Sequence, residues 1–265
     1  MADFALPAAF AVITWWFTTG VILYLNRLPP TTFGRSLFGA SVLALIAFGG
    51  LAATRGDATP AGAYAAFMCA VLIWGQQEMC FLMGYVTGPR RLACPPGCRG
   101  LKRFGYAVQV MIHHELALLA VGAAVLAVTW GGSNFVGVGT YLILWTMRLS
   151  AKLNLFLGMR NLGEEFLPPH LEYLKGYFTR RSMNLLFPVS ITLSTLVAVE
   201  LVQAAWLSRT PFGVTGYSLL AALMALAILE HWFMVLPLPT ATLWRWAMRS
   251  DNGPPVQRTD GQAAS

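Results

Sequence analysis

Residues 215–236 read TGYSLLAALMALAILEHWFMVL, and the only acidic or basic side chains in this run, apart from the phenol of Tyr217, are Glu230 and His231. The hydrocarbon core of a bilayer is crossed by about 20 predominantly apolar residues in helical conformation, so the run predicts a transmembrane helix. Six further stretches have the same character, and together the seven predict a bundle of about seven transmembrane helices. The other six are residues 6–25, 36–53, 62–86, 105–130, 135–158 and 184–207.

The composition supports a membrane protein with several spans and excludes other classes. Of the 265 residues, 57% are hydrophobic and 11% are charged, whereas soluble globular domains carry about 25% charged residues. A soluble single-core enzyme, a disordered chain and a disulfide-stapled secreted domain are therefore excluded. The fold class that we expect is an all-α, polytopic membrane helical bundle.

The 18 Lys and Arg residues predict the orientation of this bundle, because short cytoplasmic loops are enriched in these residues. Fourteen of them fall on one side of the predicted helices, and only Arg55 and Arg209 fall on the other, while Arg148 and Lys152 lie inside a predicted helix. This asymmetry places the N-terminus in the periplasm and the C-terminus in the cytoplasm. Residues 1–236 then form the transmembrane helical domain, and residues 237–265 form a cytoplasmic, mostly disordered tail.

The connection from residue 160 to residue 181 is the longest between predicted helices. Pro168 and Pro169 prevent one continuous helix here, and the following residues 171–178 are rich in aromatic side chains. Two interpretations remain open for this segment. It is either a solvated loop or a short interfacial helix that docks on the membrane surface or on a partner protein.

Several ionisable residues fall inside the predicted helices, most of them at a similar depth in the cytoplasmic half. On insertion scales, a charged side chain at the centre of a membrane helix costs about 2.5–3.5 kcal/mol, so we expect these residues to face the bundle interior. Glu200 is the exception in depth, since it lies nearer the periplasmic side. The others are Glu78, His113, His114, Glu115, Arg148, Lys152, Glu230 and His231.

Two interpretations of these residues also remain open. In the first, carboxylates and cations pair between helices, and the buried charge partners are Glu78, Glu115, Arg148, Lys152 and Glu230. In the second, the metal ligands are Glu78, His114, Glu230 and His231, or His114 and His231 bind a tetrapyrrole cofactor. The adjacent Glu230 and His231 lack the Glu-x-x-His spacing of di-iron bundles, which weakens the metal interpretation. From these residues we predict no catalytic group.

Several strings in the chain are similar to the PuhE family, and the similarity covers roughly residues 5–246. The strings are WWFTTG (15–20), WGQQEM (74–79), VTGPRR (86–91), HHE (113–115), LNLFLGMRNLGEEF (153–166) and EHW (230–232). That family comprises photosynthetic complex assembly proteins, encoded among the reaction-centre genes of purple phototrophic bacteria. The resemblance implies no catalytic residues in this chain.

The resemblance implies a multi-pass protein of the bacterial inner membrane, either the cytoplasmic or the intracytoplasmic photosynthetic membrane. Its expected function is to support assembly of the photosynthetic reaction-centre–light-harvesting complex or its bacteriochlorophyll supply. Expected partners are the lipid bilayer, reaction-centre or light-harvesting subunits and other assembly factors, with no nucleic acid. The candidate cofactors are bacteriochlorophyll, haem or a metal ion.

Two alternatives to this function remain open. The first is a membrane-embedded, metal-dependent enzyme of tetrapyrrole metabolism that uses the intramembrane Glu and His residues. The second is a small transporter, because buried charges also mark transport pathways. Of these functions, we expect a role in assembly rather than catalysis by an enzyme.

Overall fold

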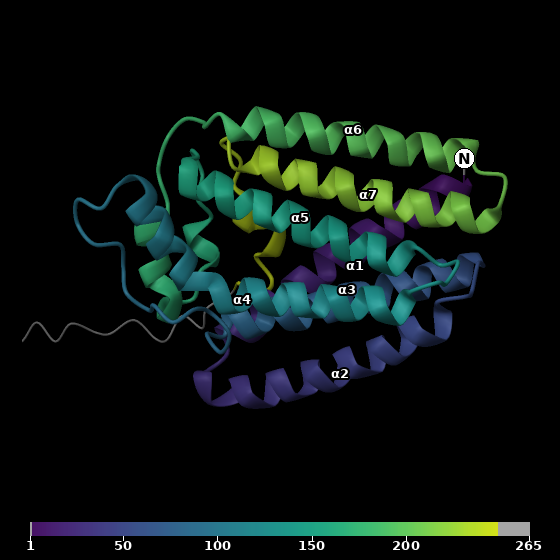
Figure 1. Cartoon of the computed structure of the whole chain (residues 1–265), viewed down its shortest axis with the longest axis horizontal. Coiled ribbons are helices and arrows are strands. Elements are labelled where there is room, and N and C mark those ends of the chain that lie inside the picture. The colour runs from purple at the N-terminus through teal and green to yellow at the C-terminus, as the bar shows by residue number, and fades with distance from the viewer. Residues whose placement is uncertain (1, 249–265) are drawn as a thin grey trace, which may run out of the picture.

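The computed structural model describes residues 2–248, and the regular elements in this range are all helical. Seven long helices run back and forth along one axis and form a bundle with two ends (Figure 1). This confirms the predicted all-α bundle. The helices are α1 (Ala2–Arg27), α2 (Phe33–Thr54), α3 (Pro60–Leu82), α4 (Gly100–Thr129), α5 (Val136–Leu157), α6 (Leu186–Leu207) and α7 (Pro211–Phe233).

Six of the seven helices are long and apolar enough to cross a membrane, and α5 is the one that is not among them. Helix α5 has 22 residues, as many as α6, but it carries Arg148 and Lys152 in its second half. It packs against α3, α4 and α7. These neighbours supply protein partners for its polar side chains, so α5 runs beside the apolar helices despite its composition.

Helices α3 and α7 form the centre of the bundle. In their most apolar stretches 56% and 61% of the residues are buried, compared with 11% in α6. The core between the helices is built from large apolar side chains such as Phe67, Leu118 and Leu219, all fully buried. Helix α6 packs mainly against α7 and lies at the periphery, so most of its surface is left to lipid or to other proteins.

One end of the bundle collects almost all the described basic residues, and we call it the basic end. It is the end at which α1, α3, α5 and α7 finish, opposite to the N-terminus in Figure 1. Of the Lys and Arg residues outside α5, only Arg55 and Arg209 in the described range lie at the other end. The arrangement matches the charge asymmetry of the sequence, and the assignment of this end to the cytoplasm stays a prediction.

Four short 3-10 helices lie in connections at the basic end: η1 (Pro30–Thr32), η2 (Glu164–Phe166), η3 (Pro169–Tyr177) and η4 (Thr240–Trp244). Helix η3 buries Leu171, Leu174 and Tyr177 against Phe81 of α3 and Val110 of α4. The segment is therefore not a solvated loop, and its docking on the membrane surface or on a partner protein stays a prediction. Its apolar side chains pack on the protein's own helices.

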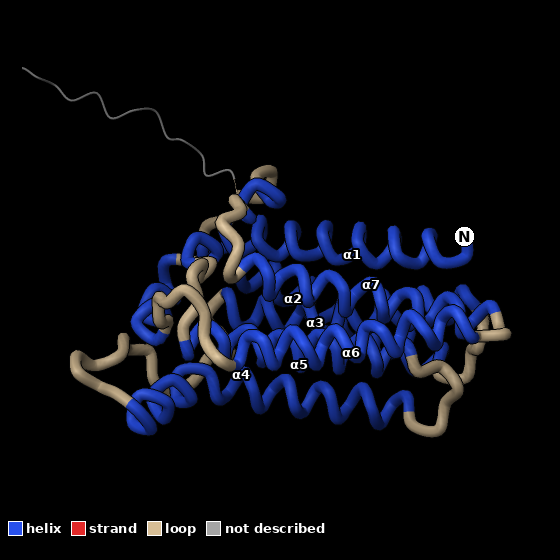
Figure 2. Tube along the Cα trace, turned by 90° about the horizontal axis from the view of Figure 1, so that it is seen from above, coloured by secondary structure: helices blue, strands red, loops and turns tan. Residues whose placement is uncertain are grey.

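The chain after α7 folds back onto α1. Trp244 and Ala247 are buried beside Leu23, and the indole N–H of Trp244 donates to the carbonyl of Trp16 at 3.1 Å. In Figure 2 this segment lies beside one end of α1, next to the start of the grey trace. The sequence assigned residues 237–265 to a mostly disordered tail, but residues 237–248 pack on the bundle. Residues 249–265 lie outside the described residues.

Candidate functional site

The central pair of the candidate site joins α3 to α5. The Nη2 atom of Arg148 lies 3.1 Å from Oε2 of Glu78, and Glu78 is 7% exposed. The Arg148 side chain keeps 41% of its surface accessible. This contact between Glu78 and Arg148 is of the kind expected in the first interpretation of the ionisable residues, in which carboxylates and cations pair between helices. Such a pair offsets much of the cost of two charges at membrane depth.

His114 of α4 completes this group, and we call Glu78, His114 and Arg148 the triad. The His114 side chain is fully buried, and its Nε2 lies 3.7 Å from Oε1 of Glu78, which is too long for a hydrogen bond. Its ring packs against Phe81 at 4.6 Å between centroids. Within the described chain, both His114 ring nitrogens, Glu78 Oε1 and Arg148 Nε have no hydrogen-bond partner. The triad is therefore packed but not fully satisfied.

The loop between α3 and α4 reaches the backbone of α4 at His114. The His114 amide donates to the carbonyl of Thr87 at 3.0 Å, and the Arg90 amide donates to the carbonyl of Gln109 at 3.3 Å. Gly88 lies between these contacts, and a Cβ atom there would overlap the Gln109 carbonyl. The string VTGPRR that marked the family resemblance thus has a structural role. It fits the loop against the helix that carries His114.

The remaining predicted residues of α4 lie outside the triad. Glu115 pairs with Lys152 of α5, with 2.6 Å between Oε1 and Nζ. Lys152 Nζ also lies 5.8 Å from the ring centroid of Phe81. His113 is exposed on the outer face of α4. The three consecutive residues of HHE therefore point in different directions, as a period of 3.6 residues per turn requires.

Glu230 was expected among the buried charge partners, but it forms no ion pair with a described cation and does not join the triad. Its Oε1 accepts a hydrogen bond of 3.0 Å from the indole N–H of Trp15, and the Glu230 side chain lies on an exposed part of α7. This contact links α7 to α1, which also pack against each other along their lengths. The string WWFTTG therefore contributes the donor for one intramembrane carboxylate.

His231, next in sequence, belongs to a separate polar network among α5, α6 and α7. Its Nδ1 lies 2.9 Å from the carbonyl oxygen of Ala227, and its Nε2 lies 2.9 Å from the hydroxyl of Ser150. A carbonyl can only accept, so Nδ1 donates, and in the neutral ring Nε2 then accepts from Ser150. Both ring nitrogens are thereby used inside the protein.

The sequence reasoning missed most of this second network. Ser150 also contacts Ser190 of α6 at 3.0 Å between hydroxyl oxygens, and the Asn154 amide donates to Ser190 at 3.2 Å. Asn184 donates to the carbonyl of Asn154 and accepts from the amide of Leu186 at the start of α6. The available signal was Asn184 itself, since Asn just before an apolar run favours a helix start.

The four predicted metal ligands, Glu78, His114, Glu230 and His231, are not brought together. Across residues 2–248 there is no group of three or more His, Cys, Asp or Glu side chains that could hold a metal ion. The reason is geometric: His231 bonds to Ser150 and Ala227, and Glu230 bonds to Trp15 on a different helix. The metal set expected from the sequence does not form.

The two predicted tetrapyrrole ligands fit that role no better. His114 is fully buried beneath Phe81 and Glu78, so a macrocycle could reach its nitrogens only after α3 and α4 moved apart. His231 is 1% exposed, and coordination would break one of its two hydrogen bonds. The geometry instead suits a scaffold in which charged and polar side chains fix how the helices are placed.

The bundle and its buried charge pairs define a multi-pass helical membrane protein. The chain belongs to the family described as "Protein of unknown function (DUF3623)", whose model matches residues 1–254. It is similar to an uncharacterized 30.4 kDa protein of Rhodobacter capsulatus located in the puhA 5′ region. The two are 39% identical over 253 residues, which cover 94% of this chain and 92% of the relative. No solved structure matches the chain.

Proposed function

We propose that this protein supports assembly of the photosynthetic reaction-centre–light-harvesting complex, or its bacteriochlorophyll supply, in the bacterial inner membrane. The observation that carries the proposal is the relative in the puhA 5′ region, which matches nearly the full length of this chain. The resemblance to the PuhE family points to the same process. The membrane-enzyme alternative needs a ligand set that residues 2–248 do not form, and no observation favours transport.

The outer face of α6 is where we propose that a partner helix binds. Thr192, Glu200 and Gln203 are exposed there, and their spacings of eight and three residues place them on one side of the helix. A groove of about 280 Å³, lined in part by Thr192 and Leu193, lies on the same face. A helix that only met lipid would not need these polar groups.

Glu200 is the most informative residue of this face. It lies seven residues before the end of α6, which corresponds to about 10 Å at 1.5 Å per residue. No Lys, Arg or His of the described residues lies within 4.0 Å of its carboxylate. A lone carboxylate at that depth is costly in lipid. A partner transmembrane helix with an Arg, Lys or His at the matching depth would lower this cost.

The test uses a phototrophic strain from which the gene has been removed. Photosynthetic complexes are measured by near-infrared absorbance of membranes, and the chain is returned either unchanged or as Glu200→Leu. We expect the unchanged chain to restore the complexes, and Glu200→Leu to restore them poorly while its own level in the membrane stays normal. A leucine removes the charge that is costly in lipid, so loss of the protein itself is not expected.

Two controls make the result decisive. Glu200→Asp keeps the charge and should restore the complexes, and Glu172→Gln changes an exposed carboxylate at the basic end and should have no effect. Total extracted bacteriochlorophyll separates the two roles: normal pigment with few complexes favours assembly, and low pigment favours supply. Normal complexes and normal pigment in the deletion strain would overturn the proposed function.

A further inference from the structure

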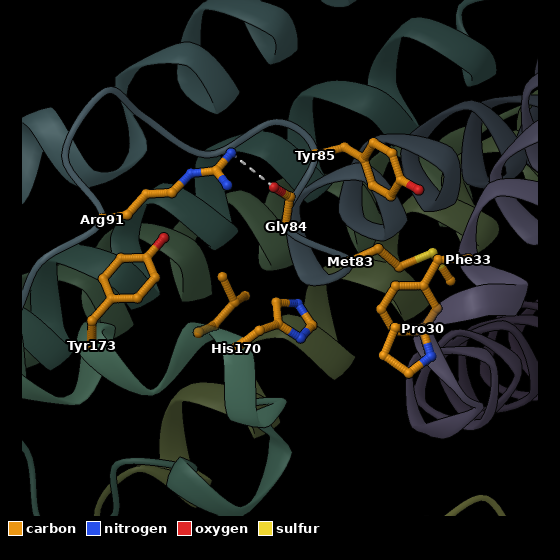
Figure 3. A pocket seen from close by; sticks show the side chains of 9 residues that line it. Pro30, Phe33, Met83, Gly84, Tyr85, Arg91, His170 and Tyr173 are labelled. Atoms are coloured by element: carbon orange, nitrogen blue, oxygen red, sulfur yellow. Dashed lines mark hydrogen bonds between the residues drawn. The ribbon is translucent and has the colours of Figure 1, made fainter.

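A pocket of about 500 Å³ opens at the basic end, and none of its lining residues belongs to the triad or to α6. It is bounded by the start of α2, the chain just after α3, Arg91 in the following loop, and η3. Figure 3 shows Arg91 and Tyr173 on one side and Met83, Phe33 and Pro30 on the other, with His170 between them. The volume is in the range of small-molecule sites in proteins.

The polar side of this pocket suits an anion. Arg91 is the only charged residue among those that line it, so no carboxylate opposes an anion there. The guanidinium uses Nη2 to donate to the carbonyl of Gly84 at 3.1 Å. Its Nη1 and Nε donate to no other described residue and remain for a ligand. Arginine presents these donors in a planar fork that matches phosphate or carboxylate oxygens.

Tyr173 supplies a second, independent observation. Its hydroxyl oxygen is buried and has no hydrogen-bond partner within residues 2–248. In Figure 3 this hydroxyl points to the side of the pocket where the Arg91 guanidinium lies. A buried polar group without a partner is unfavourable and rare in folded proteins. A ligand oxygen placed between Arg91 and Tyr173 would satisfy both groups.

The other side of the pocket favours an amphiphile over a small soluble anion. Phe33, Met83 and Leu171 are buried apolar wall residues, and His170 is fixed because its Nε2 donates to the carbonyl of Leu82 at 2.8 Å. Phe33 is the first residue of α2, which further along exposes Phe38 and Leu45 to the exterior. A headgroup in the pocket could therefore continue into acyl chains that lie along α2.

We propose that this pocket binds the anionic headgroup of a phospholipid, with its phosphate held by Arg91 and the hydroxyl of Tyr173. Basic pockets at the cytoplasmic ends of transmembrane helices are suited to such headgroups. The site goes beyond the assembly function and does not depend on it. It requires only that the basic end lies at a lipid headgroup layer.

The experiment measures lipid retention by native mass spectrometry of the full chain in mild detergent. The protein is mixed with equal amounts of phosphatidylglycerol and phosphatidylcholine, and the bound lipids are counted. We expect one phosphatidylglycerol to be retained in preference. The change Arg91→Gln should weaken this retention by about tenfold, and Tyr173→Phe should weaken it by severalfold while leaving the ring in place.

Arg99→Gln is the matched control, because Arg99 is an exposed residue of the same connection and does not line the pocket. It removes the same charge and should leave retention unchanged. Equal effects of Arg91→Gln and Arg99→Gln would show only a general attraction of the basic end and would overturn the site. Equal retention of the two lipids would overturn the anionic headgroup. Displacement of the lipid by equimolar glycerol 3-phosphate would identify a soluble phosphate ligand instead of an amphiphile.

Discussion

At the scale of single residues, the pair between Glu78 and Arg148 explains how charges are accommodated inside this bundle. We expect Glu78→Gln to leave Arg148 without its carboxylate and to lower the free energy of unfolding by about 3 kcal/mol, the lower limit for breaking a buried pair. The partial exposure of Arg148 is the reason for choosing that limit. The midpoint of thermal unfolding in mild detergent measures the loss.

The double change Glu78→Gln with Arg148→Gln tests whether the charges act as a pair. Two neutral amides leave no uncompensated charge, so the double variant should unfold at a higher temperature than Glu78→Gln alone. A double variant as unstable as the sum of the two single changes would contradict the pairing. The same comparison for Glu115 and Lys152, at 2.6 Å, serves as an internal reference.

Gly88 carries the second prediction at this scale. Its Cβ position is occupied by the Gln109 carbonyl, so Gly88→Ala must push the loop away from α4. We expect a loss of about 3 kcal/mol in unfolding free energy, the upper part of the range for overpacking. Gly105→Ala is the control, since a Cβ there meets no atom within 4 Å. Equal stability of the two variants would show that the loop does not need this close approach.

The residues of the site could be foreseen in part. Charges inside apolar runs are visible in any sequence, and similar depth made Glu78 and Arg148 plausible partners. What could not be foreseen is which of several carboxylates each cation meets, because this depends on how helices rotate about their axes. The hydroxyl and amide network around His231 was missed for the same reason. Ser and Asn residues inside helices look unremarkable until two helices bring them together.

At the scale of elements, hydropathy predicted the seven long helices but not the short 3-10 helices. The bounds of each predicted stretch lie within about five residues of the bounds of its helix, because long apolar runs favour membrane helices. Helix α5 is the exception in composition, since it is not among the six helices that are apolar enough to cross a membrane. The 3-10 helices at the basic end are too short to show a period. Their burial depends on the surfaces offered by α1, α3 and α4, which no local pattern in the sequence contains.

The segment after α7 gives a prediction at this scale. A Cβ at Gly20 of α1 would overlap the Trp246 ring, so Gly20→Val should displace residues 240–248 from α1. Trypsin should then cleave the variant after Arg245 faster than the unchanged protein, as measured by the intact mass of the product ending there. Local opening exposes backbone to proteases.

Gly39→Val is the control for this prediction, because Gly39 lies on α2 with open space around its Cβ position. It introduces the same side chain into a helix without touching the segment. Unchanged cleavage after Arg245 in Gly20→Val would contradict the packing of this segment on α1.

At the scale of the whole molecule, the concentration of positive charge at one end predicts the orientation in the membrane. Alkaline phosphatase is active only in the periplasm, so a fusion after Ser133 should be active and a fusion after Ser265 should be inactive. Ser133 lies in the connection at the end opposite to the basic end. An active fusion after Ser265 would contradict the predicted orientation of the bundle.

The central claim is that this bundle assists assembly of photosynthetic complexes, and a pulse-chase measurement tests it most directly. Reaction-centre subunits are labelled briefly as cells begin to form complexes, and the labelled fraction that enters the mature complex is followed on native gels. We predict that, without this protein, the subunits are made at the normal rate but enter the complex slowly or not at all. Normal entry at the normal rate would contradict the account.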